Sequence, residues 1–294
     1  MSPYVIAGIQ MPVSSEYVNI DAMGKRLMQL MHRFPFVQMV VFSELCAFGP
    51  LPHHAQPLPG PAEKAFCEMA AHYKIWLIPG SLMESADGKL YNTSPVIDPS
   101  GTVIARYRKM FPFMPYEYDT APGSEFVVFD VPGAGRFGLS ICYDMWIPET
   151  TRQLAAMGAE VILHPSLSDT LDRGAEIILS RASAITNQCY FFDINGLGDG
   201  GVGRSVIVDP IGAVLHQAAG GPEMMPIEID FDQVRRQRVR GLRVLGQPLK
   251  SFRDRPVEFP VYQREPGTLA YLDGLGALEK PGRDAEAPLA GGGE

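Results

Sequence analysis

The sequence predicts an α/β fold built from two similar halves. Over most of the 294 residues, short β-like runs alternate with amphipathic helical stretches. Strands that alternate with crossover helices form a sheet that is largely buried. A turn-containing segment also occurs twice, at 95–104 and 205–214, and each copy follows a strand that ends in a glycine-containing stretch. This repetition indicates two related halves whose sheets pack on each other with helices outside, although a chance similarity of two hairpins is the alternative.

The first half is predicted to contain three strands and two helices before its hairpin. Apolar runs rich in β-branched residues mark the strands, and a 3.6-residue period marks the helices. In chain order the elements are strand Tyr4–Gln10, helix Tyr17–Arg33, strand Gln38–Phe42, helix Pro61–Tyr73 and strand Ile75–Pro79.

The second half repeats this order. Its first strand ends at Cys142, and a proline suited to a first helical turn follows six residues later. The long helix carries Ile178, Ala182 and Ile185 at helical spacing. In chain order the elements are strand Gly138–Ile141, a helix from about Pro148, strand Val161–His164, helix Ala175–Gln188 and strand Tyr190–Ile194.

The repeated segment has the pattern Val-Ile-(x)-Asp-Pro-x-Gly-x-Val. Aspartate opens a turn, proline presets φ at the next position, and glycine tolerates a positive φ where the chain re-enters a strand. Each copy therefore predicts a β-hairpin at the same place in its half.

The acidic balance of the chain limits the classes of partner. Formal net charge is −8, with 33 acidic against 25 basic residues, whereas a nucleic-acid binder needs a basic face to neutralise phosphates. The basic run Arg235–Arg240 is interpreted as a solvated helix face, with an anion site as the alternative. No secretory signal is visible, and no apolar run reaches the roughly 20 residues that span a bilayer. We therefore expect neither nucleic acid nor a membrane as a partner.

The four cysteines indicate a reducing compartment. They are widely scattered without paired spacing, and in a chain without a secretory signal they are interpreted as reduced thiols. We therefore expect a cytoplasmic protein. One domain is predicted over residues 1–262 and a C-terminal extension over 263–294. The last part, Gly274–Glu294, is rich in glycine, alanine, proline and charge and is expected to be disordered.

Cys142 is the strongest candidate nucleophile. It lies where an apolar strand ends and a helix begins soon after, and such a turn exposes a side chain together with free backbone N–H groups. A buried, unreactive thiol is the alternative, because most free cysteines are small buried hydrophobes. Cys46 lies in a loop and Cys189 precedes an apolar strand, so neither has this setting.

Two further residues follow predicted strands and could act on a thiol. Glu44 comes directly after a buried strand, where a carboxylate is costly unless it is solvated or partnered. It could be a general base at the carboxyl ends of the strands, or a cap at the sheet edge. Lys109 leads into an aromatic, proline-rich loop, and a solvated lysine is the alternative there. Glu117 could likewise be an ordinary loop acid.

Together these blocks resemble the nitrilase superfamily of carbon–nitrogen hydrolases. The matching blocks come in the order of that family and cover roughly residues 4–240. They are Phe42-Ser43-Glu44 with Gly49, Tyr107-Arg108-Lys109, Ile141-Cys142-Tyr143-Asp144 with Pro148-Glu149, Ala184–Gln188, Asn195-Gly196, and Val208-Asp209-Pro210-x-Gly212.

The resemblance implies a four-layer α-β-β-α sandwich and a Glu-Lys-Cys triad at Glu44, Lys109 and Cys142. It places a second glutamate of amidase members at Glu117. It also implies pairing of subunits through their helical faces, so a homodimer or larger homo-oligomer is expected. Residues 1–262 would then be a carbon–nitrogen hydrolase domain that needs no metal or organic cofactor.

The residues after the nucleophile bear on the substrate. Nitrile-cleaving members commonly have Cys-Trp-Glu, so Cys142-Tyr143-Asp144 favours a small-molecule amide or carbamoyl compound. Met145 and Trp146 stand where members that bind carboxylates often have arginine, which favours a neutral or aromatic substrate portion near Trp146. Packing of Trp146 in the core is the alternative. Substrate-binding residues are therefore expected among Tyr143, Trp146, Tyr116 and Phe113.

Some alternatives stay open at this point. The family's common His-Trp pair is replaced by Arg173-Gly174-Ala175-Glu176, and the polar segment 166–173 also contains Asp169 and Asp172, so no particular amide can be transferred from a relative. Transfer of the acyl group to an amine, nitrile hydrolysis, and a non-catalytic binding protein are the alternatives to amide hydrolysis. A metal hydrolase would have to use His53, His54, His164 and His216, which lack the i, i+4 spacing of familiar zinc helices.

Overall fold

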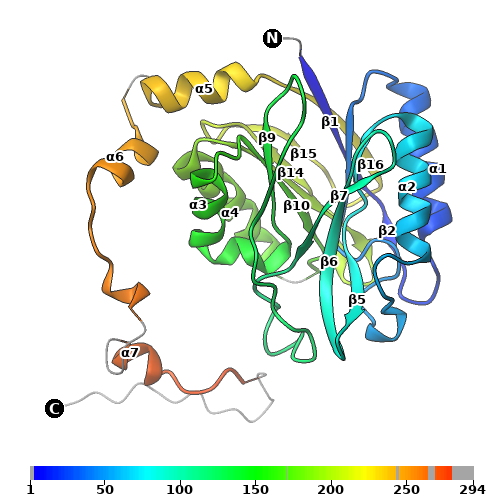
Figure 1. Cartoon of the computed structure of the whole chain (residues 1–294), viewed down its shortest axis with the longest axis horizontal. Coiled ribbons are helices and arrows are strands. Elements are labelled where there is room, and N and C mark those ends of the chain that lie inside the picture. Colours follow the sequence, from blue (N-terminus) through cyan, green and yellow to red (C-terminus); the bar gives the residue numbers. More distant parts are fainter. Residues whose placement is uncertain (1–2, 170, 243–244, 264–268, 280–294) are drawn as a thin grey trace.

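Two β-sheets pack face to face, and a pair of helices covers the outer face of each (Figure 1). The computed structural model describes residues 3–169, 171–242, 245–263 and 269–279. Its buried apolar residues form three clusters: one between the sheets, and one between each sheet and its helices. The predicted α-β-β-α sandwich is therefore confirmed.

The first sheet has the strand order β16-β1-β3-β4-β6-β5, with β7 paired to β6. Its strands β1, β3 and β4 are parallel neighbours, and helices α1 and α2 pack on it through apolar side chains such as Leu27 and Phe66. The elements are β1 Tyr4–Gln10, α1 Ile20–Arg33, β3 Met39–Phe42, α2 Pro61–Tyr73, β4 Trp76–Ile78, β5 Leu82–Ala86, β6 Lys89–Ile97, β7 Val103–Arg108 and β16 Glu223–Ile229.

The second sheet has the strand order β15-β14-β11-β10-β9-β8. Strands β9, β10 and β11 are parallel, and helices α3 and α4 cover them. A small third sheet joins β2 Pro12–Val13, β12 Leu197–Gly198 and β13 Gly201–Val202. The elements of the second sheet are β8 Val127–Asp130, β9 Arg136–Leu139, α3 Pro148–Ala156, β10 Val161–Ser166, α4 Asp172–Asn187, β11 Tyr190–Asn195, β14 Val206–Val208 and β15 Val214–Gln217.

The two halves have the same topology, which removes chance as the explanation of the repeat. The series β1-α1-β3-α2-β4-β6-β7 corresponds to β9-α3-β10-α4-β11-β14-β15, and both hairpins have a register shift at the same place, after Val96 and after Ile207. In each turn the aspartate, Asp98 or Asp209, accepts hydrogen bonds from the backbone N–H groups two and four residues later. The predicted hairpins are therefore closed by the same side-chain chemistry.

Helix α4 corrects one expectation. It begins at Asp172, three residues before the predicted Ala175, and it turns Ile178 and Ala182 outward rather than into the core. Its inner face combines Ile177 with buried polar residues that are held in a hydrogen-bond network next to the second sheet. The apolar residues at helical spacing therefore do not mark the buried face, because buried polar residues occupy the inner positions.

The arginine run on α5 (Phe231–Arg240) is only partly the solvated face that its composition suggests: Arg236 and Arg240 are exposed, whereas Arg235 and Arg238 bind other parts of the chain. Arg235 pairs with Glu160 at 2.7 Å, and half-buried Arg238 donates to the carbonyl of Ala159 at 2.5 Å. Half of the arginines in this run therefore bind α5 to the second half of the chain, and the other half face solvent as predicted.

The chain beyond α5 continues through α6 (Pro248–Asp254), a single turn at Pro260–Tyr262 and α7 (Ala270–Asp273). In Figure 1 this part lies to one side of the sandwich, and Tyr262 donates a hydrogen bond to Glu149 of α3 at 2.8 Å. Most of the predicted disordered tail Gly274–Glu294, namely residues 280–294, lies outside the described residues. None of the described helices is both long and apolar enough to cross a membrane.

Candidate active site

The candidate site lies where strand ends of both sheets meet. Glu44 follows β3 of the first sheet, and its backbone N–H donates to the carbonyl of Ser166, the last residue of β10 in the second sheet, at 3.2 Å. A cavity of about 370 Å³ opens beside this junction, within the usual size range of small-molecule sites. All eight predicted site residues line it: Glu44, Lys109, Phe113, Tyr116, Glu117, Cys142, Tyr143 and Trp146.

Close backbone packing fixes the strand end that carries Glu44. Gly80, in the glycine stretch after β4, has φ +80°, and a Cβ atom there would collide with the carbonyl oxygen of Ser43. Ser94 donates to the carbonyl of Gly80 at 2.6 Å. Glycine at this position therefore lets the chain pass directly behind Glu44.

Cys142 sits on a strained turn between β9 and the short helix Cys142–Trp146. Its φ is +46°, a conformation that non-glycine residues avoid and that commonly marks functional sites. Buried Asp144 holds the turn by accepting hydrogen bonds from the N–H of Ile141 at 2.8 Å, the N–H of Phe111 at 2.9 Å and the hydroxyl of Tyr107 at 2.6 Å. The Tyr107 bond ties the lysine motif to the cysteine motif.

Lys109 is buried between two carboxylates. Its Nζ donates to Glu44 Oε1 at 2.9 Å and to Glu117 Oε2 at 2.8 Å, and Glu44 Oε1 also accepts from the Asn92 amide at 2.8 Å. Glu117 is in turn held by the backbone N–H of Phe113. The first half of the chain thus supplies a fixed acid–lysine–acid arrangement to the cavity.

Burial and charge set the protonation states. Burial raises the pKa of Glu44, although Lys109 opposes the shift. Burial alone would lower the pKa of Lys109. The nearby Glu44, Cys142 and Glu117 outweigh this effect and raise the pKa of Lys109 well above its ordinary value. Burial and the charge of Glu44 raise the pKa of Cys142 well above that of a free thiol. At neutral pH the lysine is therefore charged and the thiol protonated, so the thiol needs a base to become a nucleophile.

One wall of the cavity is aromatic. Phe113 stacks on Tyr116 with ring centroids 5.0 Å apart, and it lies 4.9 Å from Tyr143, which stacks on Trp146 at 6.0 Å. Trp146 both lines the cavity and packs against the apolar cluster under α3 and α4. Packing of Trp146 in the core is therefore confirmed, and its contact with the substrate stays a prediction.

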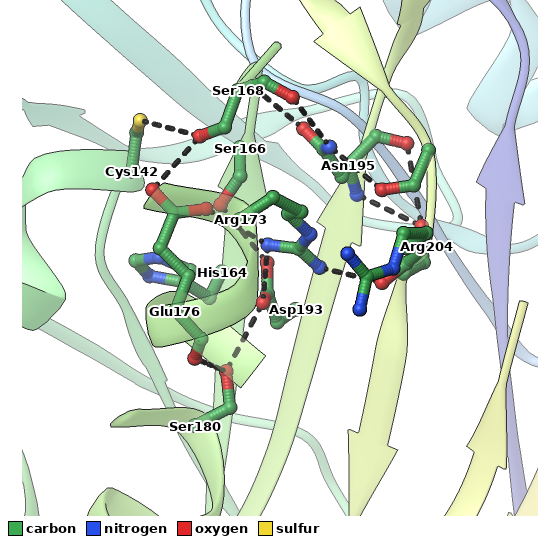
Figure 2. Close-up of polar contacts among 12 residues, drawn as sticks. Cys142, His164, Ser166, Ser168, Arg173, Glu176, Ser180, Asp193, Asn195 and Arg204 are labelled. Carbon is green, nitrogen blue, oxygen red and sulfur yellow. Dashed lines mark hydrogen bonds and ion pairs between the residues drawn. The ribbon is translucent and has the colours of Figure 1, made fainter. Parts of the chain in front are cut away.

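Another wall of the cavity is polar, and its residues Ser168 and Glu176 were not among the predicted site residues, although the sequence marked their segment as a departure from the family (Figure 2). Ser168 Oγ lies 3.9 Å from Cys142 Sγ and donates to Glu176 Oε1 at 2.8 Å. Asn195 fixes the Ser168 backbone. Its Oδ1 accepts a hydrogen bond from the Ser168 N–H at 2.8 Å, and its Nδ2 donates one to the Ser168 carbonyl at 3.0 Å. The replacement of the His-Trp pair by a segment ending in Glu176 was the signal that could have found this wall.

Asn92 and Asp144 are two further residues whose contribution the sequence did not reveal. Both are buried and make long-range contacts, Asn92 to Glu44 and Asp144 to Tyr107 and Phe111. Asp144 lies within a quoted motif, but nothing local in the sequence indicates that Tyr107 is its partner. Such contacts become visible only once strand order is known.

The competing residues are placed elsewhere or are poorly suited to reaction. Burial raises the pKa of both Cys46 and Cys189 to about 12. His164 is buried in β10 beside Ser140, whereas His216 pairs with Glu223 on the outer strands. In the described part of the chain, no group of three or more His, Cys, Asp or Glu side chains could hold a metal ion.

A protonated cysteine beside a buried carboxylate and a charged lysine defines a site suited to thiol-based nucleophilic chemistry. The carbon-nitrogen hydrolase family model matches residues 6–239, and the chain belongs to this family. It is therefore a hydrolase that acts on carbon–nitrogen bonds other than peptide bonds.

Known relatives and structures agree with this assignment. The chain is 32% identical over 198 residues to omega-amidase NIT2 of Homo sapiens, covering 62% of this chain and 71% of that protein. It is 29% identical over 254 residues to omega-amidase NIT2 of Pongo abelii, covering 80% and 91%. The crystal structure of Saccharomyces cerevisiae Nit3, of branch 10 of the nitrilase superfamily, matches with a TM-score of 0.74 and 25% identity over 81% of this chain and 93% of that one.

Proposed function

We propose that this protein hydrolyses a small amide or N-carbamoyl compound through a thioester on Cys142. The observation that carries the proposal is the placement of Cys142, on its strained turn, in the same cavity as the Glu44–Lys109–Glu117 arrangement. The similarity to omega-amidases supports an amide as the substrate.

In the first half-reaction Glu44 accepts the thiol proton as Cys142 Sγ attacks the carbonyl carbon. Lys109 Nζ and the N–H of Tyr143 stabilise the oxyanion, and each well-placed donor contributes about 3–4 kcal/mol. Glu44 then returns the proton to the nitrogen of the departing ammonia or amine, the C–N bond breaks, and the acyl group remains on sulfur. The raised pKa of Glu44 suits both proton transfers.

In the second half-reaction Glu44 takes a proton from water, whose oxygen attacks the thioester. The acid is released and the proton returns to the sulfur. Glu117 keeps Lys109 charged and in place throughout, and the aromatic wall of Phe113, Tyr116, Tyr143 and Trp146 holds the organic part of the substrate.

The test is release of ammonia from a panel of aliphatic, aromatic and carbamoyl amides and the matching nitriles. Cys142→Ala should abolish release, whereas Cys46→Ala, which removes a buried thiol two residues from Glu44, should retain it. Activity that survives in Cys142→Ala would refute the thioester mechanism. Added hydroxylamine separates hydrolysis from acyl transfer, because transfer yields a hydroxamate at the expense of the acid. Release from nitriles alone would replace the amide proposal.

We also propose that the protein forms a homodimer through the helices of its second half. The pairing of subunits through their helical faces, which the family resemblance implies, supports this, and Ile178, 67% exposed on α4, would be covered by such a partner. Sedimentation velocity should give twice the 32.2 kDa monomer mass, and Ile178→Glu should shift it to the monomer. A wild-type monomer at micromolar concentration would refute the proposal.

A further inference from the structure

The polar wall of the cavity belongs to a buried cluster in which carboxylates outnumber basic groups (Figure 2). Arg173 Nη1 lies 3.1 Å from Glu176 Oε2 and 2.8 Å from Asp193 Oδ2, so one guanidinium serves two carboxylates. All three side chains are at most 4% exposed. The neighbouring His164 adds no positive charge, because burial lowers its pKa to about 4.

Glu176 is the carboxylate of this group with the weaker compensation. Asp193 has the shorter contact to Arg173 and accepts two further hydrogen bonds, from Ser166 at 2.9 Å and Ser180 at 3.0 Å. Glu176 has the longer contact to Arg173 and one hydroxyl, that of Ser168. Of the two carboxylates, it is Glu176 that lines the cavity. Burial, followed by the charge of Asp193, accordingly raises the pKa of Glu176.

The cavity offers a second excess of negative charge. Lys109 faces both Glu44 and Glu117, and Asp169 lines the same cavity. Among the described residues that line it, Lys109 is the one cation. A carboxylate on the substrate would therefore meet repulsion, whereas a positive charge would be stabilised.

The hydrogen-bonding capacity of the polar wall points in the same direction. The Ser168 hydroxyl donates its only hydrogen bond to Glu176, so its oxygen can act only as an acceptor toward Cys142 and the cavity. Glu176 is an acceptor as well. Tyr143 and Trp146 also line the cavity, and aromatic rings attract cations. A cavity lined by hydrogen-bond acceptors and aromatic rings is complementary to an ammonium group.

We propose that Glu176, with Ser168, selects amides whose acyl chain carries a positively charged group. Glu176 bonds to Ser168, which lies beside Cys142 Sγ, the atom to which the acyl group becomes attached. Glu44, by contrast, serves the leaving amine. The charged group is therefore expected on the acyl chain of the substrate. This inference rests on the proposed amide hydrolysis and names the substrate class for it. Glu176 is thus a specificity-determining residue.

The test compares three amides of similar length: 4-aminobutanamide, which is cationic, pentanamide, which is neutral, and the monoamide of glutaric acid, which is anionic. We expect kcat/KM for the cationic amide to exceed that for pentanamide about tenfold or more, mainly through KM, and the anionic amide to be the poorest. Glu176→Gln should remove most of the cationic preference, and Glu176→Asp should retain part of it. A wild-type preference for the neutral or anionic amide would overturn the inference.

Glu160→Gln is the matched control. Glu160 is also a largely buried glutamate paired with an arginine, Arg235, but it lies outside the lining of this cavity. This variant should leave the ratio between the three amides unchanged. An equal loss of preference in both variants would assign the effect to general destabilisation and overturn the role of Glu176.

Binding of the same amides to Cys142→Ala, measured by calorimetry, separates this inference from the proposed function. Tighter binding of the cationic amide without turnover by the wild type would support Glu176 and refute amide hydrolysis. Turnover that depends on Cys142 but shows no charge preference would support amide hydrolysis and refute the role of Glu176. Equal binding of all three amides would overturn the charge selection even if the Glu176 variants failed to fold.

Discussion

Tyr107→Phe tests whether the bond between the lysine and cysteine motifs stabilises the nucleophile turn. The substitution removes one hydroxyl, which donates to Asp144 Oδ2 at 2.6 Å, and leaves the ring, which is 1% exposed, in place. A hydrogen bond to a charged group contributes about 1.5–3 kcal/mol, and Asp144 would stay buried with one donor fewer. We therefore expect the free energy of unfolding in urea to fall by about 2 kcal/mol.

Tyr4→Phe is a control of the same chemistry. Tyr4 is 5% exposed and lies between the sheets, but its buried hydroxyl has no hydrogen-bond partner among the described residues. An unpaired buried hydroxyl costs free energy, so its removal should leave stability unchanged or raise it by roughly 1 kcal/mol. Each variant thus loses one tyrosine hydroxyl, but only Tyr107→Phe should lower the free energy of unfolding.

Activity gives a second measurement for the same pair. Asp144 also holds the N–H of Ile141, next to the nucleophile, so a loosened Asp144 should lower kcat for Tyr107→Phe, whereas Tyr4→Phe should retain wild-type kcat. The reasoning fails if Tyr107→Phe unfolds within 0.5 kcal/mol of the wild type, roughly the scatter of neutral surface substitutions. It also fails if both variants lose the same stability, because ring packing rather than the hydrogen bond would then be responsible.

Three further predictions concern the environment of the site. Asn92→Ala should lower kcat at least tenfold with little change in fold by circular dichroism, because it frees Glu44 from its amide donor; a variant with wild-type kcat would contradict this. Gly80→Ala should cost more than about 2 kcal/mol in urea unfolding, because φ is +80° and the new methyl group meets Ser43; Gly133→Ala, at φ +78° in open space, is its control, and equal losses would refute the packing argument. His164 has a pKa of about 4 in the folded state against 6.5 when exposed, so its contribution to stability is complete above pH 6.5 and falls by roughly 3 kcal/mol as pH drops to 4. Urea unfolding at several pH values should show that loss reduced in His164→Gln, and an unchanged pH dependence would refute it.

Local chemistry made much of the fold predictable. The Asp-Pro-x-Gly turns hold their own backbone through Asp98 and Asp209, so their sequence alone determines the hairpins. Helix α2 begins at its proline and ends at Tyr73 as predicted. The outer face of α4 was not predictable in this way, because Glu176 and Ser180 are buried for their hydrogen bonds and not for their hydropathy.

The candidate site was predictable to a different extent on its two sides. Glu44, Lys109 and Cys142 lie in blocks that resemble a known family, and the structure brings them to one cavity. Ser168 and Glu176 lie in a segment where this chain departs from that family, so no resemblance could give them a place. Their position depends on the pairing of β10 with β11, through which Asn195 reaches the Ser168 backbone. Sequence reasoning thus finds what the family shares and misses what this chain has of its own.

The two similar halves make unequal contributions, and this inequality explains where chemistry and selectivity reside. The first half supplies the carboxylates and the lysine that we propose to move protons and hold charge, while the second supplies the proposed nucleophile and the polar wall beside it. The halves meet where the N–H of Glu44 bonds to the carbonyl of Ser166, so a change in the polar wall need not disturb the proton-transfer residues. A substitution at Glu176 should therefore alter which acyl group is accepted while Glu44, Lys109 and Cys142 keep their geometry. Selectivity can then diverge within this fold while the reaction stays the same.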